Sequence, residues 1–148
     1  MPMMDEVYLG NPLLKKANVK QEFTKEQILE FVACRNDPVY FARQHVKIVS
    51  LDEGLVTFKP YDFQEELIKR FHANRFNICK MPRQTGKSTT VISYILHNVV
   101  FNDSVNVGIL ANKAATAREL LGRLQTAYEN YLNGCNKVSC HGIEVHWS

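Results

Sequence analysis

Residues 77–89 constrain the fold of this chain more than any other stretch of its sequence. A short apolar run ends at Pro82, and a loop that carries Gly86, Lys87 and Ser88 follows it. Strand, loop and helix in this order are the context in which a phosphate-binding loop occurs. The helix is indicated by apolar side chains at helical spacing, namely Val91, Ile92, Ile95, Leu96, Val99 and Val100.

The residue types in this loop suit the binding of a triphosphate with Mg²⁺. Gly86 has no side chain, so the backbone around it can approach phosphate oxygens and donate N–H groups to them. A helix that starts near Lys87 adds unpaired N–H groups and the positive end of its dipole. We expect the Lys87 ammonium to bind the β- and γ-phosphates and the Ser88 hydroxyl to ligate Mg²⁺.

The loop departs from the common phosphate-loop pattern at one position, because Met81 stands where that pattern has its first glycine. Arg83 lies inside the loop, and its guanidinium is expected to reach the γ-phosphate as a cis arginine finger. The competing interpretation is a chance Gly-Lys-Ser at the start of an ordinary helix. The expected nucleotide-binding residues of the loop are Pro82, Arg83, Gln84, Thr85, Gly86, Lys87, Ser88 and Thr89.

Composition and charge are those of an ordinary globular domain. The 148 residues, 45% of them hydrophobic and 22% charged, suffice for one domain with a modest core. A net charge of +3 permits contact with nucleic acid but does not argue for it. We find neither a membrane-spanning run nor a secretory signal, and the four cysteines show no disulfide spacing. A reducing, cytoplasmic setting is therefore expected.

The chain is expected to have four regions. Residues 1–22 show little periodicity and are interpreted as a flexible arm with room for one short helix. Residues 23–58 are interpreted as a small N-terminal subdomain of helices and a hairpin. Residues 59–132 are expected to form the nucleotide-binding core, and residues 133–148 an atypical, disordered tail.

Two helices are expected in the N-terminal subdomain. Thr24 and Gln27 have the spacing of a capping box at the start of the first helix, which is expected to end near Arg35. Asp37 and Pro38 are typical of the cap and first position of the second. The expected buried side chains of the two helices are Ile28, Phe31, Val32, Val39, Tyr40, Phe41 and Val46.

An extended hairpin-like stretch at residues 48–58 is expected to lead into a helix that opens near Asp62. The buried stripe of that helix is expected to be Phe63, Leu67 and Phe71, with Gln64 lying off it. Beyond it, the apolar patterns predict strands at residues 76–81 and 105–110 on either side of the helix at residues 87–101.

Strand, helix and strand in this order imply a right-handed crossover and a parallel strand pair. Asn112 is expected to cap a last helix. The apolar stripe of that helix is expected to contain Leu120, Leu121, Leu124, Tyr128 and Tyr131. The predicted fold class is therefore α/β: an incomplete P-loop NTPase with a parallel sheet and flanking helices, preceded by the small helical subdomain.

The loop Arg83-Gln84-Thr85-Gly86-Lys87-Ser88 resembles the R-Q-x-G-K-[ST] loop of the large terminase subunit of tailed bacteriophages. Residues 61–64, with the sequence Tyr-Asp-Phe-Gln, look like that family's upstream glutamine motif. Residues 107–113 are similar to its second strand and turn, and residues 34–37 to its N-terminal subdomain. The resemblance covers about residues 25–132.

This resemblance implies the N-terminal part of the ATPase that drives DNA packaging. By position, Gln64 would contact adenine, Arg83 and Lys87 would act in catalysis, and Ser88 would hold Mg²⁺. The implied cofactors are ATP and Mg²⁺. The implied partners are double-stranded DNA, the portal protein and the terminase small subunit, and the implied location is the host cytoplasm.

A working ATPase of this kind also needs an aspartate at the end of an apolar strand and a glutamate that positions the attacking water. The acidic residues after Leu110 are Glu119, Glu129 and Glu144, and none of them follows such a strand. The coupling motif and nuclease domain of the family are also missing. We therefore expect the first part of a longer protein, with weak Mg²⁺-dependent ATP binding and negligible turnover.

Residues 133–148 fit the family poorly and allow two interpretations. A small zinc site is one, since soft and imidazole ligands fall in a short window at Cys135, Cys140, His141 and His146. A frameshift near the codon for Asn133 is the other, because a shifted frame allows a string similar to the family's next segment.

Two other functions compete with the packaging ATPase. A fragment of a superfamily 2-like helicase or other P-loop NTPase would share the glutamine motif and a similar loop, although helicases usually keep a glycine at the position of Met81. An inactive truncated product is the second alternative. Such a product would bind nothing, or would act as an adaptor that touches DNA or the portal through Lys113, Arg118 and Arg123. A solvent-exposed helix face would explain these three charges equally well.

Overall fold

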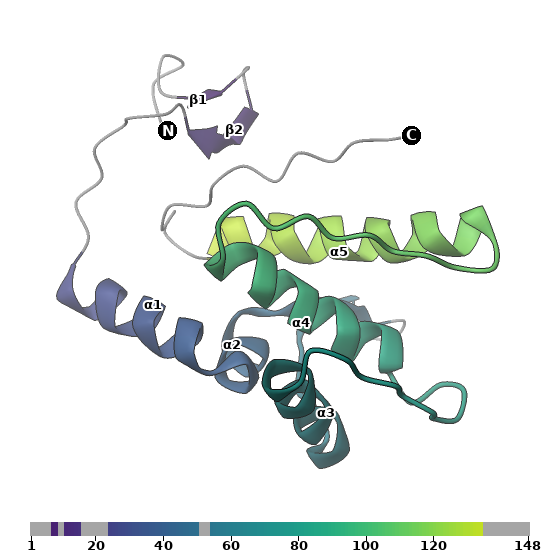
Figure 1. Cartoon of the computed structure of the whole chain (residues 1–148). Coiled ribbons are helices and arrows are strands. Elements are labelled where there is room, and N and C mark those ends of the chain that lie inside the picture. The colour runs from purple at the N-terminus through teal and green to yellow at the C-terminus, as the bar shows by residue number, and fades with distance from the viewer. Residues whose placement is uncertain (1–6, 9–10, 16–23, 51–53, 135–148) are drawn as a thin grey trace.

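The computed structural model describes residues 7–8, 11–15, 24–50 and 54–134. Five helices and two short strand pairs make up this part of the chain (Figure 1). The helices are α1 (Lys25–Asn36), α2 (Pro38–His45), α3 (Asp62–Ala73), α4 (Lys87–Phe101) and α5 (Ala114–Gly134). The strands are β1 (Val7–Tyr8), β2 (Asn11–Lys15), β3 (Lys47–Ser50) and β4 (Gly54–Thr57).

The first two helices start where their capping residues predict. The Thr24 hydroxyl accepts from the Gln27 backbone N–H, and the Gln27 side chain accepts from the Thr24 N–H, which confirms the capping box. One Asp37 carboxylate oxygen accepts from the backbone N–H groups of Val39 and Tyr40 at 2.8 and 3.1 Å. These caps satisfy donors that the first turn of a helix leaves without partners, so they fix both start points.

The predicted hairpin is confirmed as the antiparallel pair β3–β4, in which Lys47 faces Thr57 and Val49 faces Leu55. The N-terminal residues 7–15 hold a second antiparallel pair, β1–β2. Most of the arm predicted at residues 1–22 lies outside the described residues, as do residues 135–148 of the predicted tail.

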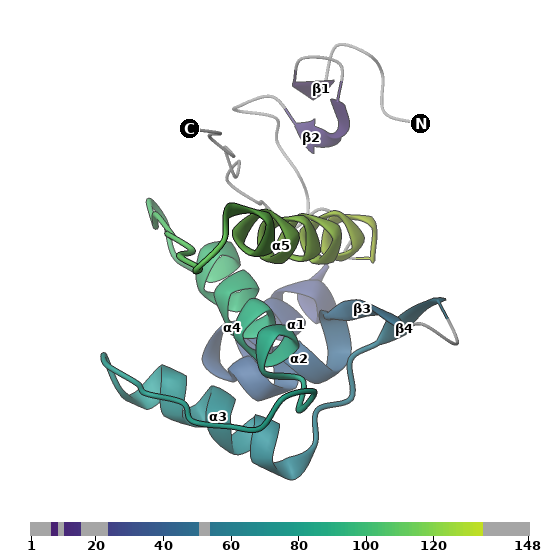
Figure 2. The same ribbon diagram turned by 90° about the vertical axis from the view of Figure 1, so that its right-hand side faces the viewer.

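Helix α4 lies at the centre, between α3 and α5, with α2 against its side (Figure 1; Figure 2). The side chains of Phe41 and Leu96 are fully buried where α2 meets α4. Their neighbours in one continuous apolar cluster are Cys34, Val39, Ala42, Val46, Phe58, Ile68, Ile92, Phe101, Ala127 and Tyr131. The core is therefore a helix-on-helix core that draws on every described helix.

The predicted parallel sheet is wrong. Residues 76–81 and 105–110 are extended but pair with no strand in the described part of the chain, whose sheets are both antiparallel and two-stranded. Ile78 is 100% exposed and Leu110 95%. In both views residues 76–81 lie beside α3, while residues 102–113 lie at α5, on the other side of α4 (Figure 1; Figure 2).

The physical reason is that a short apolar run predicts an extended backbone, whereas a strand also needs a neighbouring strand to bind its N–H and C=O groups. Helix α4 buries its apolar face on α2, α3 and α5 instead of on a sheet. A mostly helical fold therefore replaces the α/β P-loop NTPase class.

Three smaller predictions also need correction. Helix α1 exposes Ile28 and Val32 by about half, and its buried residue is Cys34. Helix α3 buries Gln64 and Ile68, and Phe63 is half exposed, so the predicted stripe is one residue out of phase. The cap position of the last helix is Lys113 rather than Asn112, because the Lys113 carbonyl accepts the first helical hydrogen bonds.

Among the described residues, no helix is long and apolar enough to cross a membrane.

Replacing Phe41 by alanine is expected to lower the free energy of unfolding by about 3–5 kcal/mol, because it leaves a cavity in the core. The matched control is Phe76→Ala, which removes the same ring from a side chain that is 82% exposed. We expect the control to change the free energy of unfolding by less than about 0.5 kcal/mol. Urea unfolding followed by circular dichroism measures both, and equal losses would show that residues 76–81 belong to the core.

His97 is a buried titratable group at the junction of α4 with α1 and α2. Its Nε2–H donates to the carbonyl oxygen of Cys34 at 2.9 Å, and its ring packs against Phe41 and Phe101. Burial lowers the pKa of His97 below its usual 6.5, although the bond to the Cys34 carbonyl opposes this shift. The folded protein therefore keeps this imidazole neutral to lower pH than the unfolded chain does.

This shift predicts that the folded protein becomes less stable as the pH is lowered. The unfolded chain binds a proton at His97 below about pH 6.5 while the folded protein does not, so the free energy of unfolding decreases as pH falls through that range. Urea unfolding at about pH 7.5 and about pH 5.5 measures the slope. His97→Gln should flatten the slope strongly. His72→Gln should flatten it only slightly, because the charge of this exposed neighbour contributes a smaller part of the lowered His97 pKa than burial does. An unchanged slope in His97→Gln would contradict the assignment.

Candidate functional site

The loop before α4 turns sharply into the helix at Gly86. This residue is the N-cap of α4 and has a left-handed backbone, with φ of 70° and ψ of 17°. Gln84 is also left-handed, with φ of 60°. No side chain caps α4, and its first helical bond runs from the Thr90 N–H to the Gly86 carbonyl. The N–H groups of the first turn therefore face the loop without helical acceptors.

The Lys87 ammonium folds back over this loop. Its Nζ donates to the carbonyl oxygens of Met81, at 2.9 Å, and Pro82. The Thr85 hydroxyl also donates to the Pro82 carbonyl, at 3.1 Å, and so closes the turn. The cation, the uncapped helix start and the turn thus share one small region, as an anion-binding loop requires.

Gln64 connects this loop to the start of α3. Its Oε1 accepts from the Tyr61 backbone N–H at 2.9 Å, and its Nε2 donates to the Thr85 carbonyl at 3.1 Å. The side chain is 4% exposed. A Cβ at Gly86 would lie 2.4 Å from Gln64 Nε2, so any other residue here would push this amide away from its present position. Gln64 therefore positions the loop of residues 82–89, a role that the sequence interpretation missed.

The other residues predicted to bind nucleotide surround this turn. Pro82, Arg83, Gln84 and Ser88 are exposed, while Thr85, Lys87 and Thr89 are half-buried. The structure places Gln64 against this loop through its bond to the Thr85 carbonyl, a contact between residues that are 21 apart in the sequence. No acidic residue occurs between residues 82 and 89, so the local charge of the loop comes from Arg83 and Lys87.

A cavity of about 880 Å³ opens beside the loop. It lies between the β3–β4 hairpin, the start of α3 and the turn at Gly86. Tyr61 and Phe63 stand at its edge with their rings stacked, 5.8 Å apart and 10° from parallel. Its lining residues are Ile48, Val56, Thr57, Phe58, Lys59, Tyr61, Phe63, Gln64, Gln84, Thr85, Gly86 and Thr89.

The sequence interpretation missed the two aromatic residues at this cavity because it assigned Phe63 to a buried stripe. A usable signal was present in Gln64 at the third helical position, because its side chain accepts from the backbone N–H of the N-cap residue Tyr61. This contact places residues 61–63 at the exposed start of the helix, where aromatic side chains are free to line a site.

The arrangement can bind a phosphate and hold a planar group nearby. Backbone N–H groups and Lys87 supply donors for phosphate oxygens, and the stacked rings supply a flat apolar surface. A comparison with models of known protein families finds no family that matches this chain. The resemblance to terminase large subunits therefore rests on the sequence segments named above and on no family match.

Gly86→Ala is expected to lower the free energy of unfolding by about 1–3 kcal/mol, because alanine is strained at this left-handed φ and meets the Gln64 amide. Chemical denaturation measures the loss. Gly122→Ala is the matched control, since its Cβ would meet nothing within 4 Å and lies in helix α5. It should stabilise the protein by about 0.5–1 kcal/mol.

A double variant separates the two causes. Gln64→Ala removes the amide that the new Cβ meets, so Gly86→Ala should cost less in that background than in the wild-type chain. Equal costs in both backgrounds would show that backbone strain alone restricts position 86.

Proposed function

We propose that this chain binds the phosphate groups of ATP with Mg²⁺ in the loop of residues 82–89. The observation that carries the proposal is the uncapped start of α4 with the Lys87 ammonium held over it. A phosphate would replace the Met81 and Pro82 carbonyls as the acceptor of Lys87 and would accept from the N–H groups of the first helical turn. Charge-assisted bonds of this kind are stronger than the neutral contacts that they replace.

Phosphate binding at this loop would not need the parallel sheet that the fold lacks, because the donors would come from the loop and from the first turn of α4. Gln64 and Gly86 hold the turn rigid before any ligand arrives. Ser88 lies exposed at the second helical position, where its hydroxyl can ligate a Mg²⁺ ion carried by the triphosphate. Arg83 is exposed and long enough to reach a terminal phosphate from the same loop.

We place the nucleobase in the cavity beside Tyr61 and Phe63. A purine ring gains from stacking on an aromatic side chain, and these rings adjoin Gln84, Thr85 and Gly86 of the loop. The amide of Gln64 lines the same cavity and keeps one N–H beyond its bond to Thr85. A contact between Gln64 and adenine therefore remains part of the proposal.

The wider role that we propose is the N-terminal part of a viral DNA-packaging ATPase, a large terminase subunit, located in the host cytoplasm. Its support is the sequence of residues 83–88 and 61–64. Double-stranded DNA, a portal protein and a small terminase subunit would then be its partners. Hydrolysis is expected to be negligible, because no acidic residue follows an apolar strand after Leu110 to activate water.

A titration with a fluorescent ATP analogue tests the phosphate site. Lys87→Ala is expected to weaken binding by about tenfold or more, because it removes a charge-assisted hydrogen bond. Lys80→Ala removes an exposed lysine a few residues away and serves as the matched control. Chelation of Mg²⁺ should weaken binding to the wild-type chain, and AMP should compete poorly because it lacks the outer phosphates.

Tyr61→Ala distinguishes the contribution of the base from that of the phosphates. It should weaken the binding of ATP more than the binding of inorganic triphosphate. Equal binding by wild-type and Lys87→Ala chains would refute the phosphate site. Rapid ATP hydrolysis by the wild-type chain, lost in Lys87→Ala, would be consistent with the phosphate site. It would show that a group other than the expected acidic residues activates the attacking water.

A further inference from the structure

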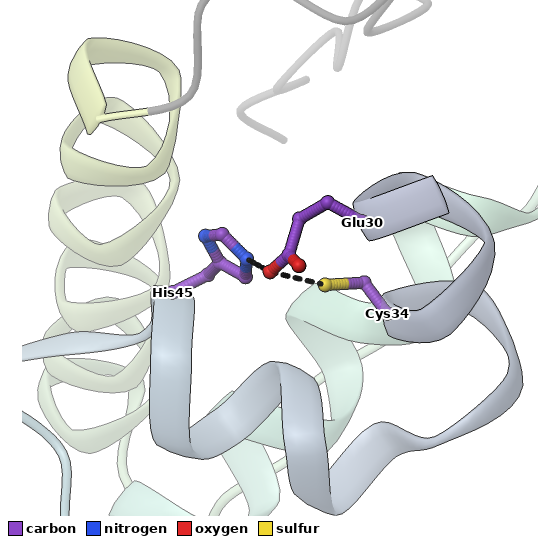
Figure 3. A group of neighbouring side chains, drawn as sticks. All are labelled: Glu30, Cys34 and His45. Carbon is purple, nitrogen blue, oxygen red and sulfur yellow. Dashed lines mark hydrogen bonds and ion pairs between the residues drawn. The ribbon is translucent and has the colours of Figure 1, made fainter. Parts of the chain in front are cut away.

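Three side chains of different chemistry meet between α1 and α2, outside the phosphate loop (Figure 3). Glu30 and Cys34 lie one turn apart on α1, and His45 is the last residue of α2. Glu30 Oε1 lies 3.0 Å from His45 Nε2 and 3.8 Å from Cys34 Sγ. All three candidate ligand atoms lie within 4.8 Å of one another.

These distances fit the ligand shell of a zinc ion. Zinc bonds of about 2.3 Å to sulfur and about 2.0–2.2 Å to nitrogen and oxygen put tetrahedral ligands roughly 3.3–3.7 Å apart. The separations of Glu30 Oε1 from His45 Nε2 and from Cys34 Sγ, 3.0 and 3.8 Å, lie on either side of that range. Small side-chain rotations would therefore suffice to place an ion among the three atoms, with no change of the backbone.

The donor types narrow the choice of metal. A thiolate, an imidazole and a carboxylate suit Zn²⁺, whereas Mg²⁺ and Ca²⁺ prefer shells made of oxygen. Three protein ligands leave one tetrahedral position for water or another small ligand. Cys34 is 3% exposed while Glu30 is about half exposed, so the ion would have a dry side and a side that solvent can reach.

Neighbouring groups already hold two of the ligands in place. The Tyr40 hydroxyl donates to the Glu30 carboxylate, 3.0 and 3.2 Å from its two oxygens. The His45 ring packs 5.9 Å from the Phe41 ring and 6.1 Å from the Tyr131 ring. Groups that orient a ligand from behind in this way are typical of metal centres.

Helix α1 is attached to the core mainly through its buried residue Cys34 and through Phe31, whose ring lies 5.1 Å from that of Phe101. The other large apolar side chains of α1, Ile28, Leu29 and Val32, are about half exposed or more. A metal bound by Glu30, Cys34 and His45 would add a direct link between α1 and the end of α2.

We propose that Glu30, Cys34 and His45 form a zinc site that clamps α1 onto α2. Binding converts the Cys34 thiol to a thiolate and releases its proton to solvent. His45 binds through Nε2 as a neutral imidazole, and its ring proton moves from Nε2 to Nδ1 through solvent. The Glu30 carboxylate exchanges its hydrogen bonds from Cys34 and His45 for a bond to the metal. Affinity therefore rises with pH, and the metal stabilises the folded chain against the unfolded one.

Cobalt(II) titration of the full chain tests this site, because a cobalt–thiolate bond gives a charge-transfer band in the near ultraviolet and zinc then displaces the cobalt. The titration is made in a variant with Cys135→Ser, Cys140→Ser, His141→Ala and His146→Ala, so that residues 135–148 contribute no thiolate or imidazole ligand. We expect the band in this variant, and its loss when Cys34→Ser is added. Cys79→Ser, at an exposed cysteine, is the matched control and should keep the band.

Zinc affinity from competition with a chromophoric chelator gives a second readout. Glu30→Gln and His45→Gln should each lower the zinc affinity by about tenfold or more, and Tyr40→Phe should lower it by about tenfold. Glu30 is exposed enough for its variant to fold even if Cys34→Ser does not, and circular dichroism checks this. A band that disappears with the tail substitutions, or that survives Cys34→Ser, overturns the proposal, as does unchanged zinc affinity in folded Glu30→Gln.

Discussion

The burial of α4 is the constraint on which the rest of this structure depends. His97 and Phe101, one turn apart on α4, meet Phe41 of α2. Ile92 and Leu96, also one turn apart, belong to the same apolar cluster as Ile68 of α3. Helix α5 adds Ala127 and Tyr131 to this cluster, and the Tyr131 ring lies 5.4 Å from that of Phe41. Because α4 is held from several directions, its first turn is rigid, and the loop before it presents its backbone N–H groups from a fixed position.

The local signals in the sequence were sufficient for the helices and insufficient for the sheet. Caps such as Thr24 and Asp37 act within three or four residues, so they can be recognised without knowing the fold. Whether residues 76–81 become a strand depends on a partner elsewhere in the chain, and the apolar pattern carries no information about that partner. The phase of α3 failed for a related reason, since an aromatic residue at a helix start can face solvent as Phe63 does.

The candidate site also has one part that the sequence predicts and another part that it does not. The loop of residues 82–89 was predictable because its chemistry is encoded in adjacent residues. The contact of Gln64 with Thr85 spans 21 residues, and the cluster of Glu30 with His45 spans 15, so neither can be read from spacing alone. Long-range contacts of a buried amide or a half-buried carboxylate appear only once the helices have been packed together.

The extended segment beside α3 has a consequence for solubility. It exposes Phe76 and Ile78 together with unpaired backbone, which is the composition of a segment prone to aggregation. Cations interrupt it, because the Arg75 guanidinium lies over the Phe76 ring at 5.2 Å and Lys80 follows two residues after Ile78. Like charges of this kind act as gatekeepers that repel a second copy. Concentrated samples should therefore stay dispersed longer in dilute buffer than in high salt, which screens that repulsion.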